Sequence, residues 1–146
     1  MSNILVCDDE KDIVVALKIY LSSDGHTVFE AYNGRQAIDI IHKNNIDLAL
    51  LDVMMPVMDG ITAVAEIRKF SNLPIILLTA KSEDTDKILG LNVGADDYVT
   101  KPFNPVEVCA RVKAQLRRYT SFGGADKRDA VLTIGDIEMD DNAKVV

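Results

Sequence analysis

The strongest constraint on the fold is a series of short hydrophobic runs, four of which end in a reactive polar residue. These four runs are followed by Asp8 and Asp9, by Asp52, by Thr79, and by Lys101 with Pro102. Stretches with apolar residues at helical spacing separate the runs. Strand and helix signals that alternate in this way predict an α/β domain, with a parallel sheet of five strands and with five helices. The carboxyl ends of parallel strands meet at one edge of a sheet, so we expect these polar side chains to converge there.

Capping residues mark several helix boundaries. Asn33, with a glutamine three residues later, is typical of a helix start with a capping box. Asn104 stands before a proline and marks the start of the last helix in the same way. Further helices are predicted over about 61–70 and about 82–91 from the spacing of their apolar residues.

Charge and composition argue against several classes of function. The net charge is −7, and the first 100 residues hold no block of Lys and Arg, which argues against direct nucleic-acid binding by this part of the chain. The chain shows no signal-peptide pattern and no apolar stretch near the length of a membrane span, so we expect a cytoplasmic protein without a membrane segment. Cys7 and Cys109 lack a CxxC spacing, which favours reduced thiols.

The composition changes after about residue 119. Residues 1–119 hold the α/β pattern, and residues 120–130 are small and polar, which is typical of a linker. Residues 131–146 resemble two short strands that are too short to bury a core. We expect them to be the truncated opening of a second domain. A frayed tail or an edge hairpin on the first domain is the alternative.

The converging side chains suit phosphoryl transfer. Asp52, which follows the central strand, can attack phosphorus and form an acyl phosphate. Asp8 and Asp9 supply the hard oxygen ligands that Mg²⁺ prefers, and without a cation the three carboxylates would repel one another. Lys101 can oppose the phosphoryl oxygens with a positive charge, and Thr79 can offer them a hydroxyl.

Over residues 3 to about 118, the chain resembles the receiver domain of two-component response regulators. The motifs that carry the resemblance are Ile4–Glu10, Leu51–Gly60, Leu78–Ala80 and Gly94–Phe103. Cys7 stands where the family usually has an aliphatic residue, which is a conservative change. The resemblance implies a flavodoxin-like fold, a doubly wound (βα)5 sheet with the strand order 2-1-3-4-5.

The resemblance also implies a phosphoacceptor and a metal site. By position, Asp52 is the phosphoacceptor and a metal ligand. Asp9 binds Mg²⁺ directly, and Asp8 does so largely through water. The backbone carbonyl of Met54 is a further ligand of the metal.

The same resemblance implies a switch. A sensor histidine kinase donates a phosphoryl group to Asp52, and Thr79 and Lys101 contact it. Tyr98 is the switch aromatic, which turns inward after phosphorylation, and the peptide bond between Lys101 and Pro102 is cis. The domain is then an acceptor that phosphorylates itself from the donor, with weak autophosphatase activity, rather than an enzyme that turns over a substrate.

Within the family, the chain resembles the OmpR/PhoB subfamily, in which the fourth helix, fifth strand and fifth helix form a symmetric dimer on phosphorylation. The end of the last helix is similar to the vancomycin-resistance regulators, and residues 132–139 are similar to the start of a winged-helix DNA-binding effector domain. The candidate residues of the dimer face are Lys87, Ile88, Leu91, Asp96, Asp97, Glu107, Arg111 and Arg118. Its candidate ion pairs are Lys87–Glu107, Asp97–Arg111 and Asp96–Arg118.

Three alternative functions fit the sequence less well than a transcriptional response regulator does. A stand-alone receiver would act through protein contacts, but it needs no tail after the linker. A phosphatase of the haloacid dehalogenase type needs an Asp-x-Asp pair after its first strand, whereas Asp8 and Asp9 are adjacent. A flavodoxin-like electron carrier needs a phosphate-binding loop where this chain has three consecutive acids, which would repel a phosphate.

Overall fold

A computed structural model of the chain describes residues 2–80 and 92–119. The helix predicted over about 82–91, with Lys87, Ile88 and Leu91, therefore lies outside the described residues, as do the linker and the segment 131–146. The chain divides into two compact units, Met1–Ala110 and Arg111–Val146. The sheet and all of the side chains of the candidate phosphoryl site belong to the first unit.

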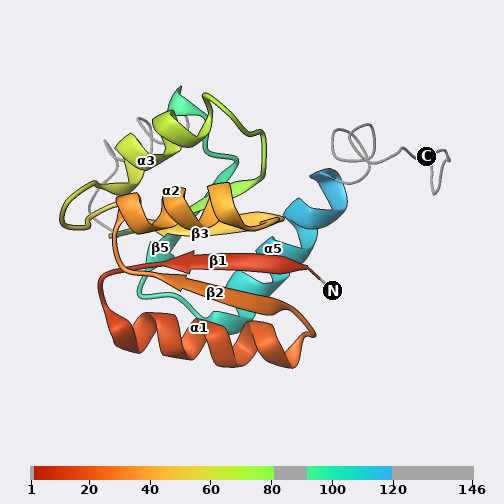
Figure 1. The fold of residues 1–146 in the computed structure, drawn as a ribbon. Helices are drawn as coiled ribbons and strands as arrows, with labels where there is room; N and C mark the ends of the chain where they lie inside the picture. The colour runs from red at the N-terminus through yellow and green to blue at the C-terminus, as the bar shows by residue number, and fades with distance from the viewer. Residues whose placement is uncertain (1, 81–91, 120–146) are drawn as a thin grey trace, which may run out of the picture. The chain divides into compact units, whose positions relative to one another are not determined.

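The centre of the first unit is a five-stranded sheet, in which every pairing between neighbouring strands is parallel. Its strand order is β2-β1-β3-β4-β5, which confirms the doubly wound order 2-1-3-4-5 (Figure 1). The strands are β1 (Asn3–Cys7), β2 (Thr27–Ala31), β3 (Leu48–Asp52), β4 (Ile75–Ala80) and β5 (Asp97–Lys101). In this register Asp52 pairs with Leu78, and Ala80 pairs with Lys101, so the polar strand ends lie at one edge.

Helices cover both faces of the sheet. The described helices are α1 (Lys11–Ser23), α2 (Gly34–Lys43), α3 (Gly60–Ile67) and α5 (Pro105–Tyr119), which crosses the boundary between the two units. Figure 1 shows α1 on one face, and α2 with α3 on the other. None of the described helices is long and apolar enough to cross a membrane.

The strands at the centre are apolar on both faces, because helices cover both sides of them. One set of alternating side chains forms a core cluster with α2 and α3, and its strand members include Leu5, Ala49, Leu51, Ile75 and Leu77. The other set, with Ile4, Val6, Leu48, Leu50, Ile76 and Leu78, is also fully buried. Successive side chains of a strand point to opposite faces, so this second set faces the side on which α1 lies.

Side-chain caps fix the helix starts near the functional edge of the sheet. Asn33 accepts a hydrogen bond from the backbone N–H of Gln36 at 2.9 Å. The amide oxygen of Gln36 accepts from the N–H of Tyr32, also at 2.9 Å, one residue before the position that a regular capping box uses. Asn104 accepts from the N–H of Val106 at 2.9 Å, as expected for the start of α5.

One helix is shorter than predicted. The helix expected over about 61–70 ends at Ile67, and Arg68 is its C-cap. The N–H groups of Lys69 and Phe70 donate to carbonyls only three residues earlier, which tightens the last turn and ends the regular helix. Apolar spacing does not distinguish these two patterns of hydrogen bonds.

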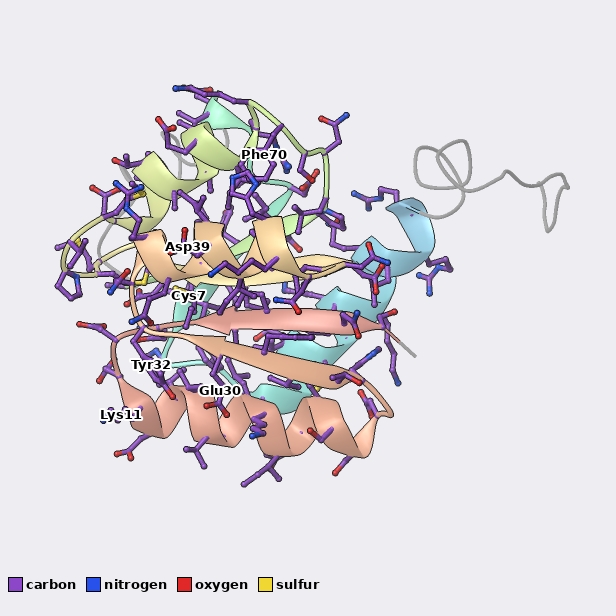
Figure 2. All side chains as sticks on the ribbon, in the orientation of Figure 1. Cys7, Lys11, Glu30, Tyr32, Asp39 and Phe70 are labelled. Carbon is purple, nitrogen blue, oxygen red and sulfur yellow. The ribbon has the colours of Figure 1, made fainter. Side chains whose placement is uncertain are left out.

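Cys7 lies at the end of β1 and is fully buried (Figure 2). Its thiol lies 3.2 Å from the carbonyl oxygen of Asn33 and 3.4 Å from the sulfur of Met55. Burial, and then the charges of the neighbouring aspartates, raise the pKa of the Cys7 thiol well above its usual range. Neither Cys7 nor Cys109 forms a disulfide, and a neutral buried thiol such as that of Cys7 acts as a small apolar residue of the core.

Candidate phosphoryl-transfer site

The three predicted metal ligands lie together at the carboxyl edge of the sheet. Carboxylate oxygens of Asp8, Asp9 and Asp52 all lie within 4.8 Å of one another. Asp8 and Asp52 are buried, and Asp9 is exposed at the rim. The backbone N–H of Asp8 donates to Ala31 at 3.2 Å, which ties this strand end to β2. Adjacent strands of a doubly wound sheet thus bring the acids together although 44 positions separate Asp8 from Asp52.

Lys101 brings a positive charge to this cluster from the end of β5. Its ammonium lies 2.9 Å from the carboxylate of Asp8, 3.2 Å from that of Asp52 and 3.4 Å from that of Glu10. The side chain is largely buried, and the peptide bond between Lys101 and Pro102 is cis. The contact with Glu10 is one that the sequence analysis did not predict.

Burial and the neighbouring charges shift the pKa of the acceptor Asp52. Burial, and next the charge of Asp8, raise the pKa of Asp52 to about 7, although the ammonium of Lys101 opposes this change. Burial alone would lower the pKa of Lys101, but the carboxylates of Asp8 and Asp52 hold it above its ordinary value. Asp52 is therefore partly protonated near neutral pH unless further positive charge enters the site, and a nucleophilic carboxylate must be ionised.

The donor set fits a small divalent cation. Three carboxylates in mutual reach provide the hard oxygen ligands of Mg²⁺. The pKa of Asp52 is raised first by burial and next by repulsion from Asp8, and a bound cation would offset both effects by stabilising the charged carboxylate. The hydroxyl of Thr79 is buried and has no hydrogen-bond partner among the residues that the structure describes. A buried polar group normally has such a partner, so this hydroxyl can donate a hydrogen bond to an oxygen of an incoming group.

The loop between β3 and α3 is held close to the acceptor. Gly60 begins α3, and its N–H donates to the carbonyl of Val53 at 2.9 Å. A Cβ atom at Gly60 would collide with the backbone carbonyl of Asp52, so the helix can approach the acceptor this closely only with glycine. Asp59 caps the same helix through the N–H of Thr62 at 2.7 Å. Met54, with 66% of its surface exposed, lies in this loop.

Comparison with known proteins decides the family. The sequence model of the response regulator receiver domain matches residues 4–113. The chain belongs to this family. The resemblance that the motifs predicted is therefore confirmed at the level of the family and of the fold.

Relatives and solved structures agree with this assignment. The receiver domain is 55% identical over 119 residues to the regulatory protein VanRc of Enterococcus gallinarum, and 48% identical over 126 residues to the regulatory protein VanR of Enterococcus faecium. The alignments cover 82% and 86% of this chain but only 52% and 54% of those proteins, so the chain spans about half their length. A two-component response regulator from Clostridium difficile is 38% identical with a TM-score of 0.79, covering 83% of this chain and 100% of that one.

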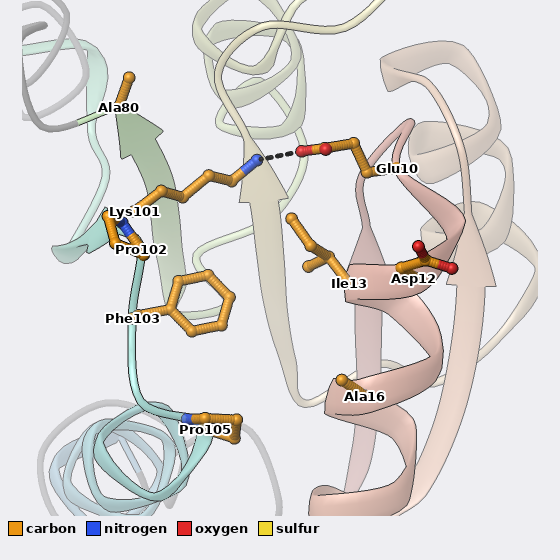
Figure 3. A pocket seen from close by; sticks show the side chains of 9 residues that line it. All are labelled: Glu10, Asp12, Ile13, Ala16, Ala80, Lys101, Pro102, Phe103 and Pro105. Atoms are coloured by element: carbon orange, nitrogen blue, oxygen red, sulfur yellow. Dashed lines mark hydrogen bonds and ion pairs between the residues drawn. The ribbon is translucent and has the colours of Figure 1, made fainter.

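A cleft of about 480 Å³ adjoins the site of the receiver domain. Lys101 and Glu10 belong both to the acidic site and to the wall of this cleft, and the rest of the wall is mainly apolar (Figure 3). The residues that line it are Glu10, Asp12, Ile13, Ala16, Ala80, Lys101, Pro102, Phe103 and Pro105.

The residues of the predicted dimer face are described only in part. Asp97 and Tyr98 lie on β5 and are half-buried, and Tyr98 packs against the core cluster. Asp96 is engaged within its own chain, because its carboxylate accepts from Arg68 at 2.8 Å and from the backbone N–H of Ile75 at 2.8 Å. Arg68 also donates to carbonyl groups of neighbouring loops, so this ion pair fastens the starts of β4 and β5.

Proposed function

We propose that this receiver domain accepts a phosphoryl group on Asp52 from a phosphohistidine of a sensor histidine kinase. The observation that supports it most directly is that three carboxylates, one ammonium and one buried hydroxyl lie at a single sheet edge, and that this hydroxyl has no hydrogen-bond partner within 2–80 and 92–119. Membership of the receiver family, and similarity to regulators such as VanR, supply the kind of partner.

The residues divide the work of phosphoryl transfer among them. An oxygen of the Asp52 carboxylate attacks phosphorus, and the bond between phosphorus and the donor nitrogen breaks with its electron pair passing to that nitrogen. The donor ring carries a proton on its other nitrogen, so it leaves as neutral imidazole. Lys101 and Thr79 lie where they can meet the transferred oxygens, the first with charge and the second with a hydrogen bond. The product is an acyl phosphate, whose slow hydrolysis in the same site would account for a weak autophosphatase activity.

Asp8, Asp9, Asp52 and the backbone carbonyl of Met54 are the groups that would hold Mg²⁺. When bound, the cation supplies the positive charge that offsets the three carboxylates and the phosphoryl oxygens. Asp9 is exposed and can bind directly, whereas Asp8 is buried and already paired with Lys101, which suits a contact through water.

The kinase would approach over the cleft beside the site. Asp52 is only 5% exposed, and Glu10 and Lys101 join its site to the cleft, so a donor imidazole would enter between the cleft and the acceptor. The adjoining cleft has apolar walls from Ile13 and Phe103, which can bind an apolar side of a kinase helix. This placement keeps the phosphohistidine and the acceptor within reach of each other.

Phosphorylation would be transmitted through Thr79 and Tyr98 to a dimer face of the OmpR/PhoB type. Movement of Thr79 toward the phosphoryl group leaves space that favours an inward rotamer of Tyr98, and the population of the active state rises. The pairs Lys87–Glu107 and Asp97–Arg111 would then form twice across a two-fold axis. Asp96 contributes less to a pair with Arg118, because Arg68 already occupies its carboxylate.

The output would be transcriptional regulation in the cytoplasm. Residues 120–130 would be a linker, and residues 131–146 the start of a winged-helix domain that binds DNA. The similarity to regulators of about twice this length supports a further domain.

Labelling with a small phosphodonor tests the proposed acceptor. Acetyl phosphate with Mg²⁺ should add one phosphoryl group to the chain, as seen by mass spectrometry, and chelation of the cation should prevent it. Asp52→Asn should abolish the label. Asp39→Asn, which removes an exposed charge on α2 (Figure 2), should keep it. A label that survives in Asp52→Asn would refute the assignment.

A further inference from the structure

Glu10 occupies a helix position that its side chain does not serve. It is the N-cap of α1 in extended conformation, and its side chain makes no capping hydrogen bond. Ser, Thr, Asp and Asn are preferred at such a position because their short side chains reach the first N–H groups of the helix. The backbone of Glu10, rather than its side chain, stabilises the start of α1. Its N–H donates to the carboxylate of Asp8 at 2.9 Å, and its carbonyl accepts from the N–H of Ile13 at 3.1 Å. The carboxylate therefore needs another explanation.

That carboxylate is directed at Lys101 (Figure 3). The distance from the ammonium to Glu10 is 3.4 Å, the longest of the three contacts that it makes with carboxylates of the described residues. Glu10 is also the most exposed of the three partners, with 63% of its side chain accessible against 0% for Asp8 and 7% for Asp52. Glu10 therefore attracts the Lys101 ammonium toward the solvent-exposed rim of the site, whereas Asp52 attracts it toward the acceptor position.

Because Glu10 shares the Lys101 ammonium with Asp8 and Asp52, it can affect the rate of phosphoryl transfer. Phosphoryl transfer to Asp52 requires a positive charge close to the negatively charged oxygens of the transferred group. Lys101 supplies that charge from this chain. A carboxylate at the rim competes for the same ammonium before any donor has arrived. We propose, on the basis of the proposed function, that Glu10 is a positioning residue whose carboxylate holds Lys101 toward the rim and so slows phosphorylation of Asp52.

The experiment compares Glu10→Gln with the wild-type chain and with Asp39→Asn, which removes the same charge from α2. Glutamine keeps the length of the side chain and leaves the backbone hydrogen bonds of position 10 in place. The rate of labelling by acetyl phosphate with Mg²⁺ should rise roughly two- to five-fold in Glu10→Gln, as expected for the loss of one exposed ion pair. The rate of Asp39→Asn should equal that of the wild type.

A second measurement separates positioning from general repulsion of the donor. Crystal structures of Glu10→Gln and of the wild type, both without a cation, should show the ammonium closer to Asp52 in the variant. An unchanged or lower rate, an equal rise in Asp39→Asn, or a higher rate without movement of Lys101 would each overturn the inference. A wild-type chain that takes no label at all would instead refute the proposed function, and the inference would fall with it.

Discussion

Asp52 lowers the free energy of unfolding when it is ionised, because its carboxylate is buried and lies beside that of Asp8. Its pKa of about 7 exceeds the ordinary value of 3.8, so between these two values the folded chain binds more protons than the unfolded chain. The free energy of unfolding therefore falls as the pH rises through this window. We predict that Asp52→Asn stabilises the protein without a cation by on the order of 2 kcal/mol near pH 8, with a smaller gain toward pH 4.

Thermal unfolding at several pH values measures this effect. Asp39→Asn, an exposed charge on α2, should leave the stability nearly unchanged. Addition of Mg²⁺ should narrow the gap between Asp52→Asn and the wild type, because the cation stabilises the chain that keeps all three carboxylates. A variant Asp52→Asn that unfolds at a lower temperature near pH 8 would show that the acid is not strained in the folded state.

At the scale of the element, the approach of α3 to β3 sets the position of the acceptor. Gly60→Ala places a methyl group against the carbonyl of Asp52, so the helix or the strand end must shift. We predict a loss of roughly 1 to 3 kcal/mol in stability, together with slower labelling by acetyl phosphate. Thr62→Ala changes an exposed residue of the same first turn and is the control for both measurements. Wild-type stability and rate in Gly60→Ala would contradict the packing described above.

The elements also show which features a sequence can predict. The strand ends that carry Asp52, Thr79 and Lys101 are predictable, because buried parallel strands are short apolar runs and their order fixes a common edge. The contact of Glu10 with Lys101 is not, since 91 positions separate the two and no motif of the sequence assigns a partner to the side chain of Glu10. The end of α3 at Ile67 depends on local hydrogen bonds that apolar spacing does not encode.

Ion pairs of the predicted dimer face are equally difficult to predict from the sequence, because each depends on which residues the fold brings together. Position alone places Asp96 on a dimer face, whereas the structure shows its carboxylate bound to Arg68 and to the N–H of Ile75. The sequence predicts that a charged residue is available for pairing. Its partner depends on which of several arginines the fold brings within reach.

At the scale of the whole molecule, we predict that phosphorylation favours a symmetric dimer. Fluoroberyllate with Mg²⁺, a mimic of the phosphoryl group, should shift the receiver domain from monomer toward dimer in analytical ultracentrifugation. Asp97→Arg and Arg111→Asp should each weaken the dimer, because either one places like charges opposite each other across the interface.

The double variant with both reversals should restore dimerisation, since the pair is then complementary again in each of its two copies. Failure of the double variant to recover would show that Asp97 and Arg111 do not meet across the interface. Dimerisation that is insensitive to all three variants would contradict a dimer face on β5 and α5.

The most direct test of the central claim is the chemical identification of the residue that a histidine kinase phosphorylates. Phosphotransfer from a panel of kinases, followed by borohydride reduction, converts an aspartyl phosphate to homoserine that peptide mass spectrometry can locate. The site described here predicts homoserine at position 52, with labelling that requires Mg²⁺ and is absent in Asp52→Asn. Homoserine at another position, or no phosphotransfer from any kinase of the panel, would contradict it.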